Sequence, residues 1–377
     1  MSGLDPAKET VHLNLDPVLL LGPGPSAVHP RVMDALSSPM RGIFDPDLLV
    51  AMGEISEGLR TLFGTANRYT LCLPASGMSA MEAGIANLVE PGDRVVVCVN
   101  GFFSGRIAHI AERYGAQVTR VQAPWGTPFE VQWIEDACKQ DAPPKLLAIV
   151  LAETSTGGRN DITGLGEIAH RHGALLMVDA VTALGGMPVE VDRHGVDYCY
   201  AGSQKCIGSP PGLAPVTLSD RALKTISARK SACQSFYLDI TLAAAYWLDG
   251  KPYHQTPSSP LIFALNEALA IVQEEGLEAR YARHAKVGSE LRAALRDIAL
   301  QALPDPGVAL PMLTVVRLPE GIEPKSVITK LRTESGIEVG AALGEMASQH
   351  IRIGTMGYAA SFENVRKVTE ALSAALA

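Results

Sequence analysis

The sequence of 377 residues has no apolar run of about 20 residues, so it contains no segment typical of a membrane-spanning helix. It also lacks an excess of positive charge, since 32 Lys and Arg residues face 40 Asp and Glu residues. Nucleic acids and anionic membranes both attract clustered cations, so neither is expected as a partner. No basic segment followed by an apolar one opens the chain, and we therefore expect a cytoplasmic protein.

Cysteine pairs and metal-ligand spacings are missing as well. The nine histidines form no H-E-x-x-H motif, and the six cysteines are scattered without C-x-x-C spacing: Cys72, Cys98, Cys138, Cys199, Cys206 and Cys233. We therefore expect reduced thiols in the core, no disulfide framework and no metal site.

Hydrophobic residues make up 47% of the chain, which predicts a well-packed globular protein of two domains. Continuous apolar stretches such as "LLAIVLA" (146–152) and "ALLMVDA" (174–180) alternate with helical patterns. This alternation is typical of an α/β fold with a mostly parallel sheet covered on both faces. We predict an N-terminal arm (1–18), a large domain (19–277) and a smaller C-terminal α+β domain (278–377).

Local signals place several elements. Asp45 followed by Pro46 predicts the start of a helix whose apolar positions run from Leu48 to Leu62. We also expect strands at 94–99, 174–179 and 197–202, and a helix at 260–275 that Gly276 ends.

The segment "GPGPSA" (22–27) satisfies the G-x-G-x-x-A pattern of a dinucleotide-binding loop. Such a loop uses backbone N–H groups to hold a pyrophosphate, and Pro23 and Pro25 remove two of those donors. We therefore interpret the segment as a stiff turn that lines a site.

Two charged residues follow apolar strands. Asp179 ends the strand "LLMVD", and Lys205 follows the expected strand 197–202. Both would face the carboxyl edge of a parallel sheet, where ligands bind in this fold class. A buried carboxylate needs a cation or a hydrogen-bond donor, and a desolvated lysine has a lowered pKa. Pyridoxal phosphate (PLP) matches this pair, because it needs a lysine amine for its aldehyde and an acid opposite its ring nitrogen.

The cofactor's phosphate also needs backbone donors. The stretch "ASGMSAMEAGIANLV" (75–89) begins an expected helix at Ser76, Gly77 and Met78. The free N–H groups and the dipole of a helix start favour an anion, although Ser-Gly before a helix is often only a cap.

Nine segments together resemble, in the same order, the class V aminotransferases of fold type I, and most of all their alanine–glyoxylate branch. These segments are "LLLGPGPS", "ASGMSAMEAGIANLVEPGD", "VNGFFSGR", "AETSTG", "LLMVDAVTALGG", "YAGSQKCIGSPPG", "SFYLDI", "YHQTP" and "IRIGTMG". The resemblance implies a seven-stranded, mostly parallel sheet, PLP as cofactor and a homodimer with a shared active site. It implies a ping-pong transfer of an amino group from a small amino acid, with alanine favoured, to glyoxylate or alternatively pyruvate.

The resemblance also implies roles for individual residues. Lys205 would bind the cofactor covalently and move the proton, and Asp179 would pair with the ring nitrogen. Four residues would surround the phosphate: Ser76, Gly77, Met78 and Gln204. Phe103 would stack on the ring, and Thr154 would form a hydrogen bond near the ring hydroxyl.

The resemblance also implies roles at the subunit interface and for the substrate. Tyr253 and Thr256 would reach the phosphate of the neighbouring subunit. Arg352 would bind the substrate carboxylate, and the backbone at Gly22 and Gly24 would line the substrate pocket. Taken singly, Phe103 could be a core residue and Arg352 an exposed strand residue.

The chain departs from its relatives at several positions. Many have tryptophan or tyrosine at position 103 and histidine at position 78, and "RGIFDPDLL" (41–49) lacks the His-Arg of serine–glyoxylate and ureidoglycine–glyoxylate enzymes. A pyridoxamine–pyruvate aminotransferase should lack the phosphate donors that are present here. A cysteine desulfurase or related lyase usually has histidine where this chain has Gln204. A non-catalytic cofactor-binding module would not need the set of Asp179, Lys205 and Arg352.

Overall fold

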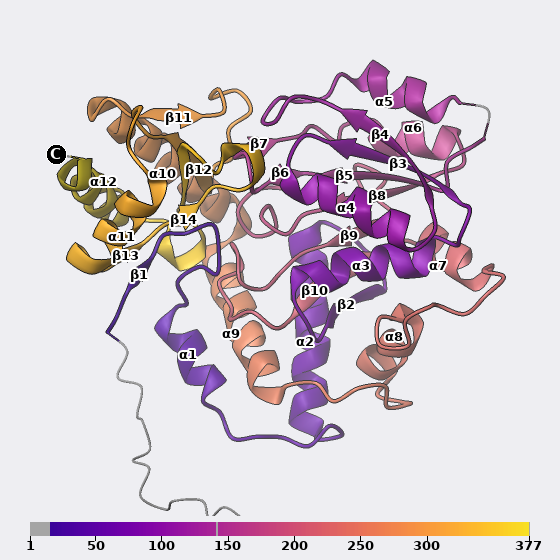
Figure 1. The fold of residues 1–377 in the computed structure, drawn as a ribbon. Helices are drawn as coiled ribbons and strands as arrows, with labels where there is room; N and C mark the ends of the chain where they lie inside the picture. The colour runs from indigo at the N-terminus through magenta and orange to yellow at the C-terminus, as the bar shows by residue number, and fades with distance from the viewer. Residues whose placement is uncertain (1–15, 141, 377) are drawn as a thin grey trace, which may run out of the picture.

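A seven-stranded sheet organises the larger part of the chain (Figure 1). The structure is a computed structural model that describes residues 16–140 and 142–376, so most of the predicted arm (1–18) lies outside the described residues. The strands lie in the order β2-β10-β9-β8-β5-β3-β4, and β10 alone in this sheet runs antiparallel to its neighbours. The predicted α/β fold with a mostly parallel seven-stranded sheet is therefore confirmed. The strands are Tyr69–Leu73 (β2), Arg94–Val99 (β3), Gln117–Gln122 (β4), Leu146–Val150 (β5), Leu175–Asp179 (β8), Tyr198–Tyr200 (β9) and Ala214–Leu218 (β10).

Helices cover both faces of this sheet. In Figure 1, α3 and α4 lie side by side below strands β3, β4, β5 and β8, whereas α5 and α6 lie on the other side of these strands. Strands such as β5, β8 and β10 are buried throughout, as their apolar sequences predict, whereas the edge strand β4 is largely exposed or half-buried. The helices of this part are Pro30–Leu36 (α1), Pro46–Phe63 (α2), Gly77–Leu88 (α3), Phe102–Arg113 (α4), Val131–Cys138 (α5), Leu165–Arg171 (α6), Asp220–Ser227 (α7), Ile240–Asp249 (α8) and Ser259–Glu275 (α9).

The start and end of α2 follow from its sequence. The side chain of Asp45 accepts a hydrogen bond from the N–H of Asp47 at 2.9 Å, and Pro46 occupies the first turn. Gly64 ends the helix in the left-handed conformation (φ 67°), which glycine adopts without strain. The predicted helix and its cap are thus confirmed.

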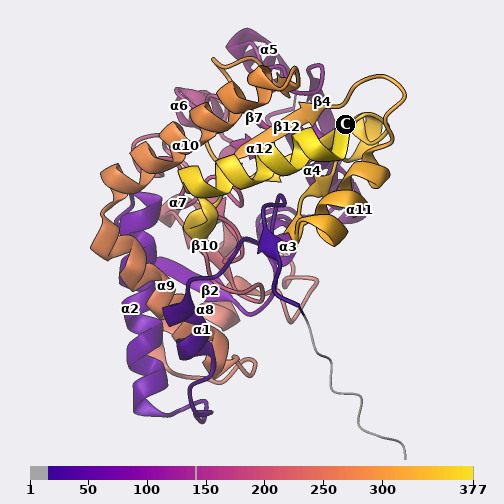
Figure 2. The same cartoon turned by 90° about the vertical axis from the view of Figure 1, so that its left-hand side faces the viewer.

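The C-terminal part has its own sheet and its own hydrophobic core. Its four-stranded antiparallel sheet has the order β11-β12-β15-β14, and α10, α11 and α12 pack with it (Figure 2). Its elements are Leu277–Asp297 (α10), Gln301–Leu303 (β11), Leu313–Arg317 (β12), Pro324–Glu334 (α11), Ile337–Glu338 (β13), Gly340–Ala341 (β14), Gly344–Met346 (η1), His350–Gly354 (β15), Gly357–Ala359 (η2) and Phe362–Leu376 (α12).

The N-terminal segment joins this C-terminal part. Strand β1 (Leu19–Leu20) pairs with β13, and Leu21 is buried in the C-terminal core. Residues 19–21 therefore pack with the C-terminal part, and the domain limits at residues 18 and 277 stay a prediction. The remaining strands, Ala152–Glu153 (β6) and Gly158–Arg159 (β7), form a short hairpin after β5.

Two further features concern the cysteines and the helices. None of the six cysteines, all of which lie in the described residues, forms a disulfide; five are buried and Cys233 is half-buried, so the expected position in the core holds for five of them. Within residues 16–140 and 142–376, none of the helices has both the length and the apolar character needed to span a bilayer.

Candidate active site

A cavity of about 520 Å³, its open mouth included, lies where β5 and β8 end. Val150 and Asp179, the last residues of these two parallel strands, both line it. Eight residues predicted from the sequence meet here: Ser76, Gly77, Met78, Phe103, Thr154, Asp179, Gln204 and Lys205. The cavity is therefore at the sheet edge where ligands bind in this fold class.

Asp179 is a buried acid with two hydrogen-bond donors. The N–H of Val181 and the hydroxyl of Tyr200 each donate to its carboxylate, at 2.8 Å in both cases. Burial raises the pKa of Asp179 to about 7, and the two donors oppose that rise. A cationic group in the cavity would favour the ionised carboxylate.

Lys205 lies in the turn that follows β9. Its Nζ donates to the backbone carbonyl of Pro23, so the turn around 22–27 contacts the lysine directly. Burial lowers the pKa of Lys205 to about 8, and the positive charge of Arg352 adds to this effect. The amine is thus easier to deprotonate than that of an exposed lysine.

Gly24 packs against the same lysine. It has a φ of 118°, and a Cβ atom at this position would lie 2.7 Å from Cδ of Lys205. Only glycine adopts this φ without strain and leaves room for Lys205, so the stiff turn fits closely against the lysine side chain.

The start of α3 offers unpaired donors to the cavity. Among the described residues, no acceptor is bonded to the N–H groups of Gly77 or Met78, and Ser76 is the N-cap. Oε1 of Gln204 is buried without a hydrogen-bond partner there, and because an amide oxygen only accepts, this side chain would offer its Nε2 to an anion. A Cβ atom on Gly77 would lie 2.9 Å from Val181, so glycine lets the helix start approach the cavity closely. An anion such as a phosphate fits this donor set.

Phe103 and Thr154 also line the cavity. The ring of Phe103 meets that of Phe102 edge-on, with centroids 5.4 Å apart. The hydroxyl of Thr154 is hydrogen-bonded to the hydroxyl of Thr182, a partner that the sequence did not indicate.

Arg352 lies on β15 and connects the two parts of the chain. Its Nε donates to the carbonyl of Ala341 at 2.9 Å, and its Nη1 donates to the carbonyl of Thr154 at 3.2 Å. Burial lowers the pKa of Arg352 to about 10, which leaves it charged at neutral pH. No carboxylate among the described residues forms an ion pair with it, so its charge is available to an anionic ligand.

Five of the predicted residues are not among those that line the cavity: Gly24 and Arg352, described above, and Gly22, Tyr253 and Thr256. Gly22 lies beside β14, where a Cβ atom would be 3.7 Å from the nitrogen of Gly340. The hydroxyls of Tyr253 and Thr256 are 2.8 Å apart, and Tyr253 is 48% exposed. Their contact with a neighbouring subunit's phosphate therefore stays a prediction.

Two residues of the site were missed from the sequence. Tyr200 is the Cα partner of Asp179 across β8 and β9, a register that apolar strand sequences do not reveal. Glu153 is fully buried, and it accepts hydrogen bonds from the N–H of Ser104 at 3.0 Å and from Oγ of Ser155 at 2.6 Å. Glu153 directly follows the apolar run "LLAIVLA", and a carboxylate in that position could have indicated a buried acid that needs hydrogen-bond donors.

The family model for class V aminotransferases ("Aminotransferase class-V") matches residues 19–368. The chain belongs to this family. Class V aminotransferases of fold type I depend on pyridoxal phosphate, and this chain is accordingly a PLP-dependent transaminase. Asp179 and Lys205, which both line the cavity, fit that cofactor together with the unpaired N–H groups at the start of α3.

Individual relatives are similar over nearly the whole chain. An alanine–glyoxylate aminotransferase of Oryctolagus cuniculus is 40% identical over 95% of this chain and 92% of its own. The crystal structure of an alanine–glyoxylate aminotransferase from Nostoc sp. superimposes with a TM-score of 0.97, at 40% identity and full coverage of both chains. A ureidoglycine–glyoxylate aminotransferase structure from Bacillus subtilis gives 0.94 at 37% identity, covering 97% of this chain and 94% of that one.

Proposed function

We propose that this class V aminotransferase moves the amino group of alanine to glyoxylate by a ping-pong mechanism. The observation that carries the proposal is the position of Arg352, whose guanidinium forms no ion pair among the described residues and donates to the carbonyl of Thr154, a residue that lines the cavity. A guanidinium in this place suits a substrate with one carboxylate next to the reacting carbon. The similarity to two alanine–glyoxylate aminotransferases at 40% identity supports this pair of substrates.

The roles of the site residues follow from their positions. When bound, PLP supplies an aldehyde that accepts the amino group and a ring that accepts electrons. Asp179 would hold a proton at the ring nitrogen, since its buried carboxylate favours a cation beside it. The N–H groups at the start of α3 and the amide nitrogen of Gln204 would hold the phosphate, and Phe103 would lie against the ring. Lys205 would accept a proton from the substrate α-carbon through Nζ and return it to the carbon that was the cofactor's aldehyde carbon, which its lowered pKa favours.

The dimer is part of this proposal. Tyr253 and Thr256 lie outside the cavity of their own chain, and several large apolar side chains near them are exposed: Met40, Phe44, Phe236 and Tyr237. A second copy covering this surface would bury these side chains and bring Tyr253 and Thr256 to the partner's phosphate. Pyruvate is the alternative acceptor, because it also carries one carboxylate beside a carbonyl.

A half-reaction screen tests the substrate pair. The purified protein loaded with PLP is mixed with single amino acids, and the loss of the cofactor's visible band is recorded. We expect alanine to give the fastest loss and glyoxylate to restore the band. Faster loss with serine or ureidoglycine would overturn the assignment of the donor, and restoration by pyruvate alone would overturn that of the acceptor.

The alternatives stay within the same fold. The similarity to the ureidoglycine–glyoxylate aminotransferase of Bacillus subtilis favours glyoxylate as acceptor. Residues 41–49 lack the His-Arg of ureidoglycine–glyoxylate and serine–glyoxylate enzymes, which counts against both of these donors. A pyridoxamine–pyruvate reaction is disfavoured because the phosphate donors at Gly77 and Met78 are present. A desulfurase needs a cysteine at the site, and none of the residues that line the cavity is one.

A further inference from the structure

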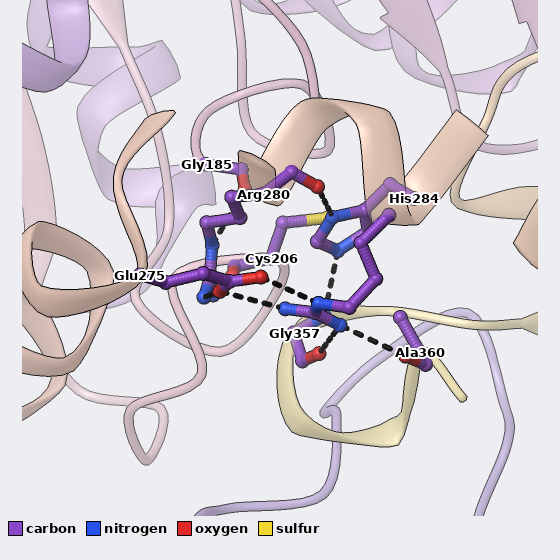
Figure 3. A network of polar contacts seen from close by, with 8 residues as sticks. Gly185, Cys206, Glu275, Arg280, His284, Gly357 and Ala360 are labelled. Carbon is purple, nitrogen blue, oxygen red and sulfur yellow. Dashed lines mark hydrogen bonds and ion pairs between the residues drawn. The ribbon is translucent and has the colours of Figure 1, made fainter. Parts of the chain in front are cut away.

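A buried polar network joins the helix pair α9–α10 to the loop that contains Lys205 (Figure 3). It consists of Glu275, Arg280, Arg283 and His284, which we call the hinge network. None of the four lines the cofactor cavity. Arg280 is only 3% exposed and His284 is fully buried, so their polar atoms depend on partners within the protein.

Arg280 holds two segments of the active site at once. Its Nη2 donates to the carbonyl of Cys206 at 2.6 Å, and Cys206 is the residue that follows Lys205. Its Nε donates to the carbonyl of Gly185 at 2.9 Å, in the segment that follows Asp179 and β8. Its Nη1 donates to the carboxylate of Glu275 at 2.7 Å and forms an ion pair with it. A planar fork with several donors can hold both carbonyls in one geometry, whereas a lysine ammonium cannot.

Arg283 and His284 hold the segment that follows Arg352. Nη1 of Arg283 donates to the carbonyls of Gly357 and Ala360, at 2.9 and 2.8 Å. The N–H of Gly357 donates to Nε2 of His284 at 3.0 Å. Because Nε2 accepts, Nδ1 carries the proton and donates to the carbonyl of Arg280 at 2.8 Å.

Glu275 links the two halves of the hinge network. Its carboxylate, which is 23% exposed, accepts from Arg280 and from Nε and Nη2 of Arg283 (2.5 and 2.9 Å), so both arginines have the same counter-ion. The two clamped segments also touch each other, because a Cβ atom on Gly357 would lie 3.2 Å from the carbonyl oxygen of Cys206. The loop of Lys205 and the segment after Arg352 therefore share one rigid support.

We propose that Glu275, Arg280, Arg283 and His284 are positioning residues that set the distance between the amine of Lys205 and the guanidinium of Arg352. This proposal rests on the proposed roles of those two residues. Arg280 acts through the peptide next to Lys205, and Arg283 with His284 acts through the segment next to Arg352. Small displacements of reacting groups cost large factors in rate, so the two halves of the network should affect different steps.

The test compares Arg280→Lys with Arg283→Lys in the full-length protein loaded with PLP. Single-turnover reactions with alanine give a maximal rate constant and an apparent Kd for the amino acid. A titration without substrate gives the pH at which the visible band of the bound cofactor changes. Arg296→Lys is the matched control, because Arg296 is an exposed arginine on the same helix α10.

For Arg280→Lys we expect a maximal rate constant about tenfold lower, an apparent Kd within about twofold of wild type and a shifted band titration. For Arg283→Lys we expect an apparent Kd about tenfold higher and an unshifted band titration. The control should match wild type. Glu275→Gln should change both constants, and it serves as the second arm if Arg280→Lys does not fold.

The proposal is overturned if folded Arg280→Lys and Arg283→Lys both match the control. It is also overturned if each lowers the melting temperature and reduces the amount of active enzyme while both constants and the band titration stay unchanged, since that is the result of a merely structural role. A wild-type protein that binds PLP but fails to react with any amino acid would instead overturn the proposed function, and this proposal with it.

Discussion

The hydroxyl of Tyr200 donates to the carboxylate of Asp179 at 2.8 Å, across two neighbouring parallel strands. This bond stabilises the ionised acid and opposes the rise in its pKa that burial causes. In Tyr200→Phe the pKa of Asp179 should therefore rise further, by about one unit. Since the cofactor's ring nitrogen needs the ionised acid, the acidic limb of the pH dependence of PLP affinity should move to higher pH by the same amount. Fluorescence titrations with PLP between pH 5 and 9 measure this shift.

Tyr198→Phe is the control for that measurement. Tyr198 lies two residues earlier on the same strand, is equally buried, and donates to the carbonyl of Ala80 at 2.7 Å instead of to Asp179. Its loss should lower stability but leave the pH limb in place. An equal shift in both variants would contradict the role of Tyr200.

Gly24→Ala should reduce activity strongly. A Cβ atom would clash with the side chain of Lys205, and the φ of 118° strains any other residue. We expect the maximal rate constant of the alanine half-reaction to fall at least about tenfold. Gly53→Ala is the control, since Gly53 lies inside α2 with no atom near its Cβ position, and alanine there should stabilise the helix slightly. Unchanged rates in Gly24→Ala would show that the turn does not position the lysine.

Arg352→Lys should weaken substrate binding far more than cofactor binding. A lysine keeps the charge but loses the two parallel donors that a carboxylate accepts. We expect the apparent Kd for alanine to rise about tenfold or more, and the Kd for PLP to stay within about twofold. Isothermal titration of PLP and single-turnover kinetics measure the two constants. Comparable losses in both would contradict the assigned role.

His284 should make stability depend on pH. Burial lowers its pKa to about 4, and the charges of Arg280 and Arg283 act in the same direction. An unfolded histidine has a pKa of about 6.5, so between these values the unfolded chain binds a proton that the folded chain does not. The contribution of neutral His284 is therefore complete above pH 6.5 and decreases by about 1.4 kcal/mol per pH unit as the pH falls towards 4. The difference in melting temperature between wild type and His284→Asn should shrink from pH 7.5 to pH 5.5, and a constant difference would contradict this.

The fold could be predicted largely because its signals are local. The cap at Asp45, the apolar strands ending at Val150 and Asp179, and the glycine stop at Gly276 all follow from neighbouring residues. These signals, with the order of the motifs, were enough to predict the seven-stranded sheet and the edge that carries the cavity.

What could not be predicted depends on contacts between distant segments. The partnership of Tyr200 with Asp179 needs the register of two strands, and the bond between Thr154 and Thr182 needs the packing of two loops. The contact of Lys205 with Pro23 joins residues far apart in the sequence. The network around Arg280 was missed for the same reason, since its acceptors are backbone carbonyls that have no sequence signature.

The central claim is that Lys205 is the residue that binds the cofactor and moves the proton. Reduction of the PLP-loaded protein with borohydride, followed by digestion and mass spectrometry, tests it directly. The account predicts one modified peptide, with the pyridoxyl phosphate group on Lys205, and no such adduct and no transamination in Lys205→Ala. An adduct on another lysine, or a Lys205→Ala protein that still transaminates at the wild-type rate, would contradict it.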